Sequence, residues 1–177
     1  LGFETGTDIH FSNSYFSNNA FYLSDSIYGF SLEHNIGLGH FECQNSSYVD
    51  SLYIYNNTFP HGNNFRFGRY SSTTDAIIRS NEMNISTFYW DRYSPQPDQE
   101  WGTGSKNCVN FLLDSNTISL NSFYAYYRIS FDNVKFSNND FTCKNNGYYN
   151  SFSFPGEQNL DYRFNLFNKF EISGNTF

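Results

Sequence analysis

One short phrase recurs seven times along the 177 residues and limits what this chain can fold into. It reads apolar, any, apolar, two further residues, Asn, any, apolar, and its clearest copy is LYIYNNTF at residues 52–59. The other copies lie at residues 9–16, 30–37, 76–83, 111–118, 134–141 and 170–177. Their polar positions are Ser14, Asn35, Asn57, Asn81, Asn116, Asn139 and Asn175.

The spacing of these polar positions predicts a solenoid. Successive differences between the residue numbers above are 21, 22, 24, 35, 23 and 36. A period in the low twenties is typical of repeats that stack only on their neighbours. The two long steps indicate insertions at about residues 89–107 and 144–168. We therefore predict one domain over residues 1–177, with about seven coils of 21–24 residues and two longer insertions.

The coil that begins at Leu52 shows how each repeat should fold. Leu52 and Ile54 alternate with two tyrosines, the pattern of a short strand with one buried face. Asn57 indicates a turn, because Asn tolerates left-handed backbone. A second short strand then begins at residue 58, and residues 65–67 alternate as a third strand. Three short strands per coil form one turn of an all-β parallel β-helix.

Stacked coils would align the repeated residues in columns. The Asn side chains can both donate and accept along the stack, so they should form an internal ladder that satisfies buried turn groups. Phe59, Phe141 and Phe177 should share one interior column. Both columns are interpreted as structural. The third strands of the other coils are expected at residues 21–23, 40–43, 88–90 and 124–126 and at about 149–154.

Composition narrows the classes of function. Hydrophobic content is only 38%, but aromatic residues make up 21%, which disordered chains lack. A net charge of −7 disfavours nucleic acid as a partner. No apolar run approaches the roughly 18 residues of a membrane span. Cys43, Cys108 and Cys143 are far apart and without a C-x-x-C pair, so we expect buried thiols, no disulfide framework, no metal site and no cofactor.

The ends of the chain lead to a further expectation. The sequence begins at Leu1 rather than at Met, and its last phrase finishes at Phe177. Solenoids need caps over their terminal coils, because exposed coil ends are unpaired sheet edges. We therefore expect a fragment of a longer chain, with neighbouring domains of that chain as partners.

The phrase, the coil length and the Asn column resemble right-handed parallel β-helix proteins of the pectin-lyase-like superfamily. The resemblance covers essentially the whole chain and implies a right-handed coil. Many members of that superfamily bind polysaccharide along the outer face of the strand that we number third, with flanking loops as groove walls. The resemblance thus implies a groove over the third strands and the two insertions.

Alternation along the third strands identifies the side chains that would face this groove. Outward positions carry aromatic rings, which cover apolar sugar faces, and charged groups, which bind hydroxyls. The insertion at residues 89–107 adds both tryptophans of the chain. An ordinary solvated sheet face is the alternative interpretation. The residues predicted to bind substrate are Tyr22, His40, Tyr89, Trp90, Arg92 and Trp101.

Cleavage would need two carboxyl groups about 5–9.5 Å apart, as in glycosidases. Glu42 and Asp91 lie two predicted coils apart with Arg66 between them, and coils stack about 4.8 Å apart. These three residues are the catalytic candidates, for a hydrolase or for a lyase in which Arg66 neutralises a uronate. However, the chain lacks the Asp-Asp, Gly-His-Gly and Arg-x-Lys motifs of pectin-type enzymes; GLGH at residues 37–40 resembles only part of one. Enzymatic activity stays an open question.

Two classes of function follow. The leading hypothesis is an extracellular or cell-surface module that binds a polysaccharide, with cleavage as an open addition. The alternative is a structural or adhesive solenoid, such as part of a surface protein or a phage tail spike, without catalysis. A trimeric shaft would show outward apolar stripes, whereas the phrase strands carry a mixed set outward, and a homo-oligomer stays open. That set is His10, Ser31, Tyr53, Lys135 and Glu171.

Overall fold

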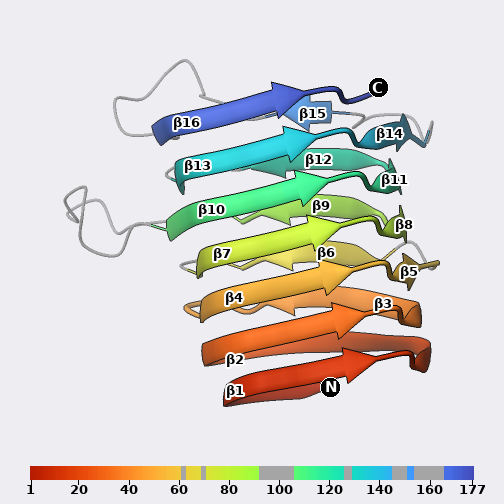
Figure 1. Cartoon of the computed structure of the whole chain (residues 1–177), viewed down its shortest axis with the longest axis vertical. Helices are drawn as coiled ribbons and strands as arrows, with labels where there is room; N and C mark the ends of the chain where they lie inside the picture. The colour runs from red at the N-terminus through yellow and green to blue at the C-terminus, as the bar shows by residue number, and fades with distance from the viewer. Residues whose placement is uncertain (61–62, 69–70, 92–105, 126–128, 145–150, 154–165) are drawn as a thin grey trace.

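The computed structural model describes residues 1–60, 63–68, 71–91, 106–125, 129–144, 151–153 and 166–177. These residues form sixteen parallel strands wound into a β-solenoid of about five turns, with no helix among them (Figure 1). The all-β parallel solenoid is confirmed. The predicted seven coils are slightly more than the about five turns that the structure shows. None of the described residues forms a helix long and apolar enough to span a bilayer.

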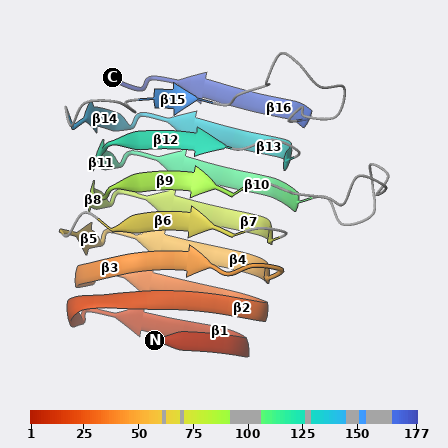
Figure 2. The same cartoon turned by 180° about the vertical axis from the view of Figure 1, so that it is seen from behind.

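The strands form three stacks. The repeated phrase builds the front sheet of Figure 1, made of β1 (Gly2–Ser12), β2 (Tyr15–Glu33), β4 (Tyr48–Tyr55), β7 (Ser72–Arg79), β10 (Lys106–Asp114), β13 (Ile129–Ser137) and β16 (Leu166–Ser173). The rear sheet, nearest the viewer in Figure 2, holds β3 (Ile36–Cys43), β6 (Asn64–Phe67), β9 (Thr87–Trp90), β12 (Ser122–Ala125) and β15 (Ser151–Ser153). The side sheet holds β5 (Thr58–Phe59), β8 (Glu82–Asn84), β11 (Thr117–Leu120) and β14 (Asp140–Cys143).

The long strand β2 runs through all three stacks and shows how one coil is built. Its first residue, Tyr15, pairs with Ile36 in the side sheet. Residues 21–23 pair with β3 in the rear sheet, and residues 26–33 pair with β4 in the front sheet. Left-handed backbone at Asn18 (φ 56°) and Asp25 (φ 59°) makes the two corners between these segments. Short polar side chains tolerate that conformation, which explains their place at corners.

The predicted Asn ladder is present inside the solenoid. The backbone N–H and the side-chain Nδ2 of Asn35 both donate to Oδ1 of Asn57, at 2.9 and 3.0 Å. The Nδ2 of Asn57 also donates to the carbonyl of Leu32 in the preceding coil, at 2.8 Å. The same pattern continues through Asn81, Asn116, Asn139 and Asn175. Each amide therefore satisfies buried backbone groups of the coil before it.

The turn beside the ladder differs from the prediction in one respect. The left-handed residue is not the ladder Asn but the residue before it, for example Asn56 (φ 52°) before Asn57 and Ser115 (φ 54°) before Asn116. The preceding residue makes the bend, so that the ladder Asn is free to point inward. A second left-handed residue interrupts every front strand, at Asp8, Gly29, Ser51, Asp75, Asn110, Asn133 and Lys169.

The core consists of aromatic columns at the coil spacing. On the inner side of the rear sheet, Phe65 stacks on Phe41 at 4.6 Å and on Phe88 at 4.7 Å between ring centroids. Each fully buried ring contributes roughly 1.5–3 kcal/mol. The side-sheet column forms in part: register places Met83 and Ile118 between the buried rings of Phe59 and Phe141, and Phe177 stacks on Phe141 at 5.3 Å between ring centroids. Phe177 is 70% exposed, so the predicted interior position is wrong for this residue.

The cysteines follow the expectation only in part. Cys43 and Cys108 are buried thiols in the core. Cys143, the last residue of β14, is exposed, although it lies in register with buried Leu120.

We expect Asn57→Ala to destabilise the solenoid by at least about 3 kcal/mol. The substitution leaves two buried donors of Asn35 without an acceptor, and each such group costs about 1–3 kcal/mol. Urea unfolding followed by circular dichroism measures the change. As a control, Asn84→Ala removes a single exposed hydrogen bond to Pro60 and should cost less than about 1 kcal/mol. Equal effects of the two substitutions would contradict the structural role of the ladder.

A second polar cluster surrounds Asp114 at the end of β10. Its carboxylate accepts hydrogen bonds from Ser137 Oγ (2.7 Å), Asn138 Nδ2 (3.1 Å) and Ser115 Oγ (3.1 Å). Arg79 Nε also donates to it, at 3.1 Å. Burial alone would raise the pKa of Asp114, but these hydrogen bonds and the charge of Arg79 outweigh burial and lower the pKa. The ionised carboxylate therefore joins three successive coils.

This cluster should make stability depend on pH. The pKa of Asp114 is lower in the folded state than its usual value of 3.8. The stabilisation that ionised Asp114 adds to the folded state is therefore complete above pH 3.8 and is lost as pH falls through the folded-state pKa. We expect Asp114→Asn to cost about 2 kcal/mol at pH 7 and progressively less below pH 3.8. Urea unfolding across this pH range measures the difference, with exposed Asp140→Asn as the control. A difference that is independent of pH would contradict this role.

Candidate functional site

The outer face of the rear sheet carries one continuous row of side chains. The buried rings of the Phe column alternate with outward residues, as strand geometry requires. Backbone register aligns these outward residues on successive coils of the rear sheet, whose strands Figure 2 shows stacked one above another. We call this row the rear column: Tyr22, Glu42, Arg66, Tyr89 and Tyr124.

The three catalytic candidates meet in the middle of the rear column. Arg66 Nη1 donates to Glu42 Oε1 at 2.7 Å, and Arg66 Nη2 donates to Asp91 Oδ2 at 2.6 Å. On the other side, His40 Nε2 bonds Glu42 Oε2 at 2.9 Å. The side chains of Glu42, Arg66 and Asp91 are only 11%, 22% and 16% exposed. The guanidinium therefore lies between the two carboxylates in a largely desolvated cluster.

Electrostatics favour this arrangement. Burial alone would lower the pKa of Arg66, but the hydrogen bond to Asp91 and the charges of Glu42 and Asp91 outweigh burial and raise the pKa. Two carboxylates face one guanidinium, so the cluster has an excess of negative charge. The Nε of Arg66 is buried without a hydrogen-bond partner, which leaves the two Nη groups as its bonding ends.

The tyrosines of the rear column lie in a stack rather than as open platforms. Tyr89 and Tyr124 have ring centroids 5.2 Å apart and planes 23° apart. Arg66 Cζ lies 5.8 Å from the centroid of the Tyr89 ring, a cation–π contact. Register places Arg66 and Tyr124 on the two sides of Tyr89 along the axis. Both faces of this ring are thus covered, and its edge is the part that a ligand can reach.

One predicted groove residue belongs to the core instead. Trp90 is fully buried and stacks on Phe67 at 5.2 Å, with edge contacts to Phe111 and Phe131. Along β9, Phe88 points inward and Tyr89 outward, so alternation sends Trp90 inward again. The prediction that Trp90 binds substrate placed this residue in a loop and is wrong. Strand alternation along residues 88–90 was the signal that could have identified Trp90 as a core residue.

The remaining predicted residues divide into two groups. Tyr22 and His40 lie on the outer face with ring centroids 5.5 Å apart. Arg92 and Trp101 lie outside the described residues, as do most of the two insertions.

The strand predicted at residues 124–126 is shifted. Observed β12 covers Ser122–Ala125, with Phe123 stacked on Phe88 at 4.8 Å and Tyr124 outward. A one-residue slip exchanges the two faces of a strand. Sequence reasoning therefore missed Tyr124 as an outward partner of Tyr89. The column of inward Phe rings was the signal that could have given the correct register, because Phe123 continues this column.

The glycines of GLGH have a packing explanation. Gly37 has φ +81°, and a Cβ there would lie 1.9 Å from the carbonyl oxygen of Phe16. A Cβ at Gly39 would lie 2.8 Å from the carbonyl oxygen of Asn18. Both glycines permit a close approach of backbones between neighbouring coils. The partial likeness to a catalytic motif is therefore accounted for by coil stacking.

These observations define the class of the protein as a parallel β-solenoid with a charged outer column. Comparisons with protein-family models, curated proteins and solved structures return no match. In the part of the chain that the structure describes, no group of three or more His, Cys, Asp or Glu side chains could hold a metal ion.

We expect Arg66→Met to destabilise the protein by about 2 kcal/mol, between the values for exposed and buried ion pairs. The substitution leaves Glu42 and Asp91 without their shared cation. A triple variant that adds Glu42→Gln and Asp91→Asn removes the uncompensated charge and should recover at least half of the loss. Urea unfolding measures both variants. A triple variant as unstable as Arg66→Met would contradict the electrostatic origin of the effect.

Proposed function

We propose that this chain is an extracellular or cell-surface carbohydrate-binding β-solenoid of the pectin-lyase-like type. The observation that carries the proposal is the rear column, where phenol, acidic and basic groups line up on successive coils, with the imidazole of His40 beside Glu42. A sugar chain presents hydroxyls at regular intervals, and a solenoid presents its side chains at a coil spacing of about 4.8 Å. A chain lying along the axis can therefore meet one outward side chain of the rear column on each coil.

The geometry favours binding over cleavage. A glycosidase needs space between its two carboxyl groups for the scissile bond or the attacking water. Here the guanidinium of Arg66 fills the space between Glu42 and Asp91. The same contacts weaken the lyase hypothesis, because both Nη groups of Arg66 are already engaged by carboxylates. A uronate would have to displace one of them. We therefore propose a binding role for these three residues.

A second candidate function, adhesion by a structural solenoid, is supported by the front sheet. The set of outward residues first considered there omitted Ile77 and Leu112, which lie in register between Tyr53 and Lys135. Ile77 is 37% exposed, and Tyr28 on the same sheet is 48% exposed. Exposed apolar side chains on one face are typical of contact surfaces. The front sheet is thus more apolar than the sequence analysis indicated.

A polysaccharide panel with a reducing-end assay tests the proposal. We expect the intact protein to bind at least one glycan without releasing products. Glu42→Gln and Tyr22→Ser should each weaken binding about tenfold, the loss of one charge-assisted or aromatic contact. Thr142→Ala, on the exposed side sheet, is the matched control and should bind as the intact protein does.

Three outcomes would contradict the proposal. Failure of the intact protein to bind any glycan would favour the structural function. Undiminished binding by both rear-column variants would remove the rear column as the site. Release of reducing ends by the intact protein but not by Glu42→Gln would contradict binding without cleavage and would indicate that the protein is an enzyme.

A further inference from the structure

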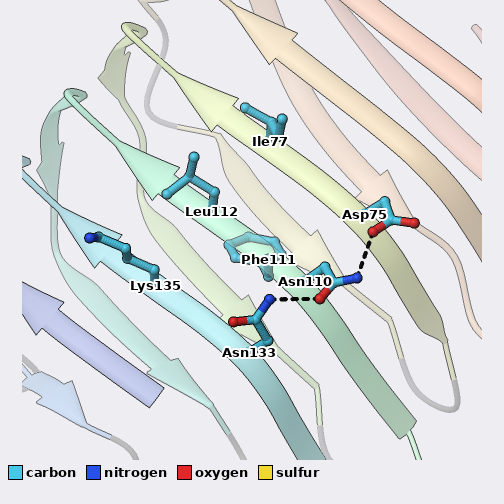
Figure 3. A pocket seen from close by; sticks show the side chains of 7 residues that line it. All are labelled: Asp75, Ile77, Asn110, Phe111, Leu112, Asn133 and Lys135. Atoms are coloured by element: carbon cyan, nitrogen blue, oxygen red, sulfur yellow. Dashed lines mark hydrogen bonds between the residues drawn. The ribbon is translucent and has the colours of Figure 1, made fainter. Parts of the chain in front are cut away.

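The front sheet contains a polar row that the repeat phrase does not include. The left-handed residues that interrupt β7, β10 and β13 are Asp75 (φ 52°), Asn110 (φ 51°) and Asn133 (φ 53°). Figure 3 shows their side chains joined in sequence across three coils. Asn133 Nδ2 donates to Asn110 Oδ1, and Asn110 Nδ2 donates to Asp75 Oδ1, both at 2.7 Å. All donors point toward Asp75, so the row has a direction.

The row retains bonding capacity for a ligand. An amide Nδ2 carries two hydrogens, and each Asn of the row uses one of them on its neighbour. Among the described residues, no side chain or backbone group bonds Asp75 Oδ2 or Asn133 Oδ1. The polar row therefore offers acceptors at both ends and one N–H at each Asn, spaced at the distance between coils.

An apolar row runs beside it, two residues further along each strand. Ile77 and Leu112 lie in register on the outer face and are partly exposed. Lys135 continues this row and pairs with Glu171 at 2.9 Å. The polar and apolar rows line a shallow groove of about 340 Å³ (Figure 3). This volume lies at the lower end of the range for small-molecule sites.

We propose that this groove is a second ligand site, and that it takes a neutral, hydroxyl-rich oligosaccharide lying along the solenoid axis. The apolar row would contact the C–H faces of the sugar rings, and the polar row would bond their hydroxyls. A pyranose unit in an extended chain advances by about one coil spacing, so successive units meet equivalent contacts.

The charge of the groove and the cost of desolvating its polar atoms disfavour two other classes of ligand. A polyanionic glycan would meet Asp75, and Lys135, the one cation among the described residues that line the groove, already pairs with Glu171. The net charge of −7 adds to this repulsion. A wholly apolar ligand would cover the free acceptors of the polar row without replacing their hydrogen bonds to water, which would weaken its binding.

The groove is independent of the rear column. It lies on the front sheet, whereas the rear column lies on the opposite sheet (Figures 1 and 2). Its residues share no hydrogen bond or ion pair with Glu42 or Arg66 in the described part of the chain. The two sites can therefore be tested separately in the same protein.

Titration of ¹⁵N-labelled protein with cellohexaose, mannohexaose and a galacturonate hexamer tests this inference. We expect at least one neutral probe to shift backbone amide signals of β7, β10 and β13, with the galacturonate hexamer binding more weakly. Asn110→Gly should weaken the neutral probe at least tenfold, because Gly keeps the left-handed backbone and removes the central amide. Ser51→Gly, at the equivalent left-handed position of β4 outside the groove, is the control.

The outcomes separate this site from the rear column. Glu42→Gln should leave the shifts of β7, β10 and β13 unchanged even where it abolishes shifts in the rear sheet. No shift in the front sheet with either neutral probe would overturn the inference. Tighter binding of the galacturonate hexamer, or equal affinities for Asn110→Gly and Ser51→Gly, would overturn it as well.

Discussion

The Asn ladder is the interaction on which the rest of this structure depends. Short strands joined by tight turns leave many buried backbone groups that strand pairing cannot satisfy. Each ladder amide bonds the coil before it through Nδ2 and accepts two hydrogens through Oδ1, as Asn57 does between Leu32 and Asn35. Because a buried unpaired group costs about 1–3 kcal/mol, the ladder also penalises any slip of one coil against the next.

Fixed register is what turns a repeated sequence into outer columns. Once Asn57 and Asn81 are aligned, Glu42, Arg66 and Tyr89 must follow one another on the rear sheet. The same register puts equivalent positions of the front strands side by side. The outer surface therefore consists of rows parallel to the axis, each with the chemistry of one position in the coil. Such rows suit extended ligands better than compact ones.

Much of this arrangement could be predicted because it rests on periodicity. The spacing of the phrase predicted the solenoid, and strand alternation predicted that Glu42 and Arg66 would lie on one face. The errors lie where periodicity is locally broken. Trp90 was read as part of a loop although alternation sends it inward, and Tyr124 was shifted by one residue. Ile77 and Leu112 interrupt the otherwise mixed polar outward row of the front sheet, because they lie in register between Tyr53 and Lys135.

The sequence by itself determined the coil, its period and the inward columns, because these depend on local alternation and on an Asn that recurs at one position. Only the tertiary structure decided which outward groups pair. The guanidinium of Arg66 between two carboxylates, and the amide row ending at Asp75, each join residues from three coils. Such contacts depend on side-chain directions and on left-handed turns between strands, which no spacing along the chain specifies.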